Sequence, residues 1–117
     1  VKEVLKDPLQ CAMEFVKRYE NTVLVLKDQH TIICRKDDMY MNTAGNHALA
    51  KGGSGDVLCG ILTGLYTQGK EALQAAAAAV YVHACAADEL IQRMDAYSIQ
   101  PGDLIAVLSD TYGKLKR

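Results

Sequence analysis

The sequence predicts an α/β fold, and three observations support this class. Two short apolar runs, 22–26 and 31–34, are typical of strands in a sheet that is covered on both faces. Apolar residues at helical spacing lie both before and after these runs. A polar, glycine-rich segment separates the runs from the C-terminal helical part. We therefore expect one helix, three strands, a glycine loop and three helices, in that order.

The first half of the chain carries clear start and stop signals. Asp7 and Pro8 predict the start of a helix, because Asp caps helix N-termini and Pro fits the first turn. The apolar spacing of this helix continues to about Tyr19. Polar turns follow each of the two apolar runs, and a third short strand is expected at 39–41.

The second half is expected to be helical. One helix is predicted from residue 57 to near Gly69, a second over 71–92 with an alanine-rich middle, and a third from Pro101 onward. Three strands are too few to complete a doubly covered sheet. The chain is therefore expected to form one part of a larger domain.

Composition excludes several classes of protein. The 117 residues include 50% hydrophobic residues, which argues against intrinsic disorder. With 13 basic and 14 acidic residues, the net charge is −1, so neither nucleic acid nor an anionic membrane is expected as a partner. The longest apolar stretch is interrupted by His83 and is too short to cross a bilayer.

The cysteines and histidines predict neither a disulfide framework nor a metal centre. Four cysteines are widely spaced in apolar runs, which favours reduced, structural thiols and a cytoplasmic protein. No metal-ligand cluster is expected, because the three histidines lack partners at ligand spacing.

The glycine-rich segment from Asn42 to Asp56 is the most informative part of the sequence. It follows a strand and leads into a helix, where glycines let the backbone approach a ligand and unpaired amides attract anions. It lacks the Walker A pattern, because Gly52 follows Lys51 where that motif needs a hydroxyl residue after Lys. Asp56 at the helix start suits a general base, although Ser54 or Asp56 as a simple helix cap is equally compatible with the pattern.

These residues resemble a known family, the ADP/ATP-dependent NAD(P)H-hydrate dehydratases of the ribokinase-like superfamily. The resemblance rests on the run Gly-Gly-Ser-Gly-Asp-Val-Leu at 52–58 and on its lead-in Asn-x-x-Gly-Asn at 42–46. Val-Leu-Lys at 25–27, Gln-Gly at 68–69, His83 and Asp88 fit the same pattern.

The resemblance implies a ribokinase-like three-layer α/β/α fold, of which residues 1–117 would be the C-terminal part of a single carbohydrate-kinase-type domain. The implied activity is nucleotide-dependent dehydration of hydrated NADH or NADPH, a repair reaction. ADP would be used in preference to ATP, together with Mg²⁺, by a cytoplasmic homo-oligomer. The 117 residues alone are expected to be inactive, because the other wall of the site would be missing.

The resemblance also implies roles for single residues. Asp56 would contact the substrate and act as the base, and the backbone amides of 52–56 would form an anion hole. No metal ligand is implied. The nucleotide would be contacted by residues from three segments: Lys27, Asp28, Gln29, His30, Thr31, Asn42, Gly45, Asn46, Gly52, Gly53, Ser54 and Gly55.

Several departures from the family pattern keep alternatives open. Asp28 replaces the usual Gly, which could weaken nucleotide binding, and Lys51 replaces the usual Thr, most simply as a solvated loop residue. Ala84 and Ala87 replace glycines on the helix after the loop. His83 on that apolar helix is more typical of a packed residue than of a catalytic one. The alternatives are a small-molecule kinase of the same superfamily, a nucleotide-binding regulator and a non-catalytic interaction segment.

Overall fold

The computed structural model describes residues 7–27 and 30–115, and within them the predicted order of elements is confirmed. One helix and three strands come first, followed by a 3₁₀ turn, two helices, a second 3₁₀ turn and a last helix. The elements are α2 (Pro8–Arg18), β1 (Leu24–Leu26), β2 (Ile32–Arg35), β3 (Asp38–Met41), η1 (His47–Ala50), α3 (Ser54–Thr67), α4 (Ala72–Leu90), η2 (Ala96–Ser98) and α5 (Pro101–Leu115).

The three strands form an antiparallel meander in the order β1-β2-β3. Val25 pairs with Ile33, and Ile33 pairs with Tyr40. The tight turn between β2 and β3 places Lys36 in the left-handed region, with φ of 51°. Since side chains alternate across a strand, the sheet presents two distinct apolar faces.

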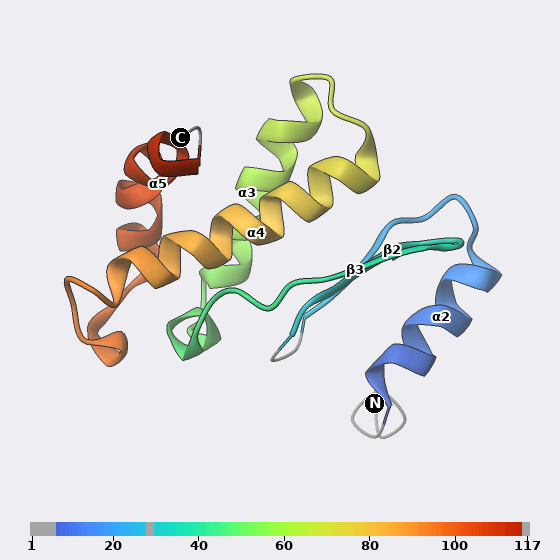
Figure 1. The fold of residues 1–117 in the computed structure, drawn as a ribbon, viewed down its shortest axis with the longest axis horizontal. Coiled ribbons are helices and arrows are strands. Elements are labelled where there is room, and N and C mark those ends of the chain that lie inside the picture. Colours follow the sequence, from blue (N-terminus) through green and yellow to red (C-terminus); the bar gives the residue numbers. More distant parts are fainter. Residues whose placement is uncertain (1–6, 28–29, 116–117) are drawn as a thin grey trace.

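The sheet lies between two helical layers, which confirms the predicted α/β/α arrangement. Helix α2 covers one face through Ala12 and Val16, which pack with Ile32 and Cys34 of β2. The opposite face presents Ile33 to a second core formed mainly by α3, α4 and α5. Figure 1 shows α2 on one side of the sheet and the other three helices on the far side.

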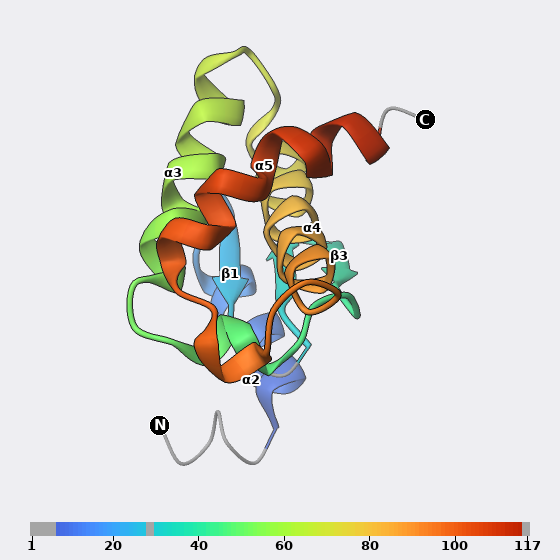
Figure 2. The same cartoon turned by 90° about the vertical axis from the view of Figure 1, so that its left-hand side faces the viewer.

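Helix α4 is the centre of the C-terminal layer and packs against both α3 and α5 (Figure 2). Its alanines at 75, 76, 79, 86 and 87 are almost fully buried. Small side chains allow the neighbouring helices to approach closely, so the alanine-rich run is a packing surface. Helix α4 is therefore well suited to hold other segments in fixed positions.

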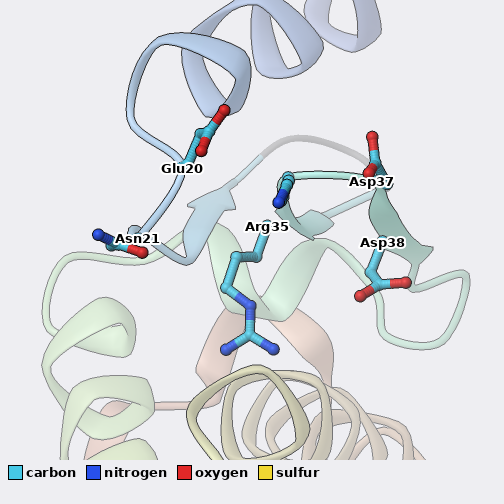
Figure 3. Close-up of a pocket in the computed structure, with 6 residues that line it drawn as sticks. Glu20, Asn21, Arg35, Asp37 and Asp38 are labelled. Atoms are coloured by element: carbon cyan, nitrogen blue, oxygen red, sulfur yellow. The ribbon is translucent and has the colours of Figure 1, made fainter.

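The N-terminus of α4 is tied to the sheet by an ion pair. Arg35 at the end of β2 donates to Glu71, the N-cap of α4. In Figure 3, the Arg35 guanidinium points away from Asp37 and Asp38 and toward the C-terminal helices. The Leu73 amide and the Arg35 guanidinium hold the pKa of Glu71 below its usual value. The shallow charged pocket of Figure 3, of about 390 Å³, therefore borders a structural contact.

Two sequence expectations differ from the structure. The segment 42–55, expected to be a glycine loop, contains η1, because the Asn46 side chain accepts from the Ala48 amide and caps a short turn, and its last two residues already belong to α3. The cysteines are all free thiols, but only Cys34 is fully buried, whereas Cys59 lies on the exposed side of α3.

In the described part of the chain, no helix is both long and apolar enough to cross a bilayer.

Candidate functional site

The turn that leads into α3 leaves two backbone amides open. Gly53 is the N-cap, with φ of 92° and no side-chain capping bond. The Ser54 and Val57 amides donate to the carbonyl oxygens of Lys51 and Gly53. Among the described residues, the amides of Gly55 and Asp56 have no acceptor. Because these amides point along the positive end of the helix dipole, the start of α3 is suited to an anion.

Lys27 brings a positive charge to the same place. It follows β1, and its Nζ lies so close to α3 that a Cβ added to Gly55 would be 2.9 Å from it. The absence of a side chain at residue 55 therefore leaves room for the ammonium group. Open amides and a lysine ammonium together form the kind of site that binds phosphate.

A pocket of about 730 Å³ lies beside this point and collects six of the predicted nucleotide-binding residues. They come from the end of β1, the start of β2 and the segment after β3: Lys27, His30, Thr31, Asn42, Gly45 and Asn46. Asp28 and Gln29, also predicted, lie outside the described residues. A volume of this size is within the range of pockets that hold small-molecule ligands.

The remaining predicted residues lie next to this pocket, outside its lining. Gly52, Gly53, Ser54 and Gly55 form the turn and the first residues of α3. Asp56 is exposed and borders a different, mostly apolar groove of about 470 Å³ between α3 and α5. The first turn of α3 thus separates the pocket from the groove, with the open amides at the boundary.

Other pocket residues were not predicted from the sequence. The side chains of Leu49, Leu58 and Val80 give the pocket an apolar wall, and His47 also lines it. Lys51, expected to be a solvated loop residue, lines the pocket and donates to the carbonyl oxygen of Tyr97 in an exposed contact. A helical apolar stripe predicts burial of Leu58 and Val80 in general, but it does not show that they face a cavity.

Asp88 on α4 holds the segment after β3 in place. Its carboxylate accepts from the Gly45 amide at 3.0 Å and from Asn46 Nδ2 at 2.9 Å. Gly45 has φ of 102°, a conformation that favours glycine. Asp88 therefore fixes the positions of two predicted binding residues. The presence of an acid on the side of an apolar helix could have indicated this role from the sequence.

A second contact joins α4 to the start of α3. Ser54 Oγ and His83 Nε2 are 3.1 Å apart, and both residues are almost completely buried. Burial lowers the pKa of His83 below its usual value, and the positive charge of Lys27 acts in the same direction. His83 is therefore held in its neutral form at neutral pH, as a packed and hydrogen-bonded residue.

The free energy of unfolding is expected to fall as the pH drops below about 6.5, the usual histidine pKa. Below that pH the unfolded chain binds a proton that buried His83 resists, so protonation favours unfolding. Glu71 and Glu89, whose pKa values are lowered from 4.5, affect stability only at lower pH. Urea unfolding at pH 7.0, 6.0 and 5.5 measures the slope. A His83→Gln variant with the same slope as wild type would contradict this assignment.

The described residues contain no group of three or more His, Cys, Asp or Glu side chains placed to hold a metal ion. Magnesium sites with nucleotides often use only one or two carboxylates together with phosphate oxygens. Asp56 is an exposed carboxylate beside the open amides and is compatible with that arrangement.

Comparison with known proteins connects this geometry to a family. The family described as "NAD(P)H-hydrate dehydratase" matches residues 1–109. The bifunctional NAD(P)H-hydrate repair enzyme Nnr of Helicobacter pylori is 39% identical over 103 residues, which cover 88% of this chain and 22% of that protein. The ADP-dependent (S)-NAD(P)H-hydrate dehydratase of Bacillus subtilis is 34% identical over 109 residues, covering 92% of this chain and 39% of that protein.

Solved structures agree with these sequence matches. The ADP/ATP-dependent NAD(P)H-hydrate dehydratase from Bacillus subtilis, co-crystallised with ATP/Mg²⁺, superposes with a TM-score of 0.90 at 32% identity. The match covers 97% of this chain and 41% of that one, so the chain spans about a fifth to two-fifths of the length of these relatives. The ribokinase-like fold is thereby confirmed, and the chain belongs to the NAD(P)H-hydrate dehydratase family.

Proposed function

We propose that this chain carries the nucleotide site and the catalytic base of an enzyme that dehydrates hydrated NADH and NADPH. The observation that carries the proposal is the start of α3, where open amides and Lys27 Nζ meet beside a pocket of ligand size. The activities for which the relatives are named support the same conclusion. ADP is preferred to ATP in this proposal, because one of those relatives is described as ADP-dependent.

Residues at the start of α3 are proposed to have different roles in the reaction. Lys27 and the amides of Gly55 and Asp56 bind phosphate oxygens and stabilise negative charge where it develops. The Asp56 carboxylate accepts the proton of the hydroxyl group on the damaged ring. When bound, the nucleotide would lose one phosphoryl group to this hydroxyl and thereby convert it into a good leaving group, which would depart from the ring as inorganic phosphate. Asp56 borders the groove and the nucleotide residues line the pocket, so substrate and nucleotide would meet at the open amides between the two.

Magnesium is proposed to enter with the nucleotide phosphates. Among the residues that the structure describes, Asp56 offers a carboxylate next to the open amides, whereas Asp88 is already committed to Gly45 and Asn46. We further propose that residues 1–117 form the C-terminal part of one larger ribokinase-like domain, since the solved relative is more than twice as long. Homo-oligomerisation and a cytoplasmic location remain predictions, and so does the inactivity of the 117 residues alone.

Gly55→Ala is expected to weaken nucleotide binding roughly 10-fold without unfolding the protein. The added methyl group would be 2.9 Å from Lys27 Nζ, so the flexible lysine must move away from the start of α3. Gly60→Ala on the same helix is the matched control, because a Cβ there meets no atom within 4 Å. Titration calorimetry with ADP and Mg²⁺ measures both variants. Equal affinities would contradict the role given to Lys27.

The proposed function is tested with the protein as its gene encodes it. Incubation with hydrated NADH, ADP and Mg²⁺ is expected to restore NADH absorbance, with stoichiometric release of phosphate. A kinase of the same superfamily would instead transfer phosphate to a small molecule and leave the absorbance unchanged. NADH absorbance that returns only when nucleotide is present supports dehydration. If the absorbance does not return with nucleotide, the proposed function is rejected.

A further inference from the structure

The hydroxyl group of Ser54, the first residue of α3, contacts a neighbouring helix. A helix is normally capped by the side chain of its N-cap residue, which accepts from an amide two or three residues further on. In α3 the N-cap is Gly53, which provides no side-chain bond, and Ser54 Oγ instead contacts His83 Nε2 at 3.1 Å. Because Gly53 has no side chain, the amides of Gly55 and Asp56 that a cap would occupy are left free for a ligand.

His83 is well placed to fix this arrangement. Its side chain is only 4% exposed, and Ser54 is 1% exposed, so water does not compete for the contact. Buried polar groups without a partner are costly, which makes the pair strongly coupled. His83 lies in the middle of α4, whose alanine-rich face is packed against α3 and α5.

The contact acts directly on the proposed anion site. Gly55 and Asp56 follow Ser54 immediately, and each residue advances a helix by only about 1.5 Å. A shift of Ser54 would therefore move both open amides and the Asp56 carboxylate together. Helix α4 also anchors Gly45 and Asn46 through Asp88, so one rigid helix holds both glycine-containing segments of the site.

We propose, on the basis of the proposed function, that His83 is a positioning residue that fixes Ser54, and through Ser54 the positions of the open amides of Gly55 and Asp56 that receive phosphate. His83 acts through Ser54 and takes no part in proton transfer to the substrate.

A double-mutant cycle tests the proposal in the protein as its gene encodes it. His83→Leu and Ser54→Ala are each expected to raise the Kd for ADP with Mg²⁺ and to lower kcat, together reducing kcat/KM roughly 10- to 100-fold. The double variant is expected to lose no more than the more impaired single variant, because both changes break one contact. His83→Gln, which can still bond to Ser54, is expected to recover most of the loss. Ser109→Ala, at an exposed position on α5, is the control and should match wild type.

The outcomes separate this proposal from the proposed function. Losses that multiply in the double variant, or a His83→Gln variant as impaired as His83→Leu, would overturn the positioning role. A lower melting temperature with unchanged kcat and Kd would show a purely structural contact and overturn it too. If the wild type binds ADP but does not dehydrate its substrate, the proposed reaction is rejected. The Kd values for ADP across the double-mutant cycle still decide the role of His83. If His83→Leu does not fold, the comparison of Ser54→Ala with His83→Gln decides the role of His83. A wild type that binds no ADP rejects both proposals.

Discussion

Asp56→Asn is expected to lower kcat for dehydration about 10²- to 10⁴-fold, the range that a positioned general base contributes. The amide keeps the size of the carboxylate but cannot accept a proton from the ring hydroxyl. Asp56 is exposed in the first turn of α3, so the variant should lose only about 0.3–1 kcal/mol of helix-dipole stabilisation. The loss is therefore expected in kcat, with the fold largely retained.

Asp110→Asn is the matched control for this experiment. Asp110 lies on α5, is exposed, and is 3.5 Å from Arg93 in a surface ion pair. Surface pairs of this kind contribute little to stability, so its turnover should equal that of wild type. An Asp56→Asn variant that keeps more than half of the wild-type kcat would exclude Asp56 as the base. It would favour the interpretation of Asp56 as a residue that only stabilises the helix start.

The fold was largely predictable because its signals are local. Helix starts at Pro8 and Pro101 follow from the fixed φ of proline, and the strand pairs follow from apolar runs separated by polar turns. The turn η1 was not predicted, since it depends on a single capping bond from the Asn46 side chain. Local sequence signals alone therefore place the layers better than they place the turns between them.

The candidate site was predictable only in part, because its residues come together through tertiary contacts. The glycine run indicated an anion site, and six predicted residues do line one pocket. Spacing along the chain could not show that Lys27 would reach Gly55, or that Ser54 would pair with His83, 29 residues away. It also could not show that Asp56 would face the groove on the other side of α3. These relations depend on how α3 and the sheet pack against α4.

Gly53→Ala is expected to destabilise the protein by about 2–4 kcal/mol, through strained backbone and a steric clash. Gly53 has φ of 92°, in a region that residues with a side chain rarely adopt. A Cβ at this position would also lie 2.9 Å from Cγ of Pro101, the first residue of α5. The proline ring is rigid, so either the turn or the start of α5 must shift. Urea unfolding monitored by circular dichroism measures the change.

Gly52→Ala provides the control at the neighbouring position. A Cβ on Gly52 would meet no atom within 4 Å, and its φ lies outside the left-handed region. The substitution should therefore change the free energy of unfolding by no more than about 0.5 kcal/mol. Two adjacent glycines in one binding loop are thus expected to differ several-fold in their cost of substitution. If both variants lose the same stability, the turn before α3 would not depend on the conformation of Gly53, and the open amides would need another explanation.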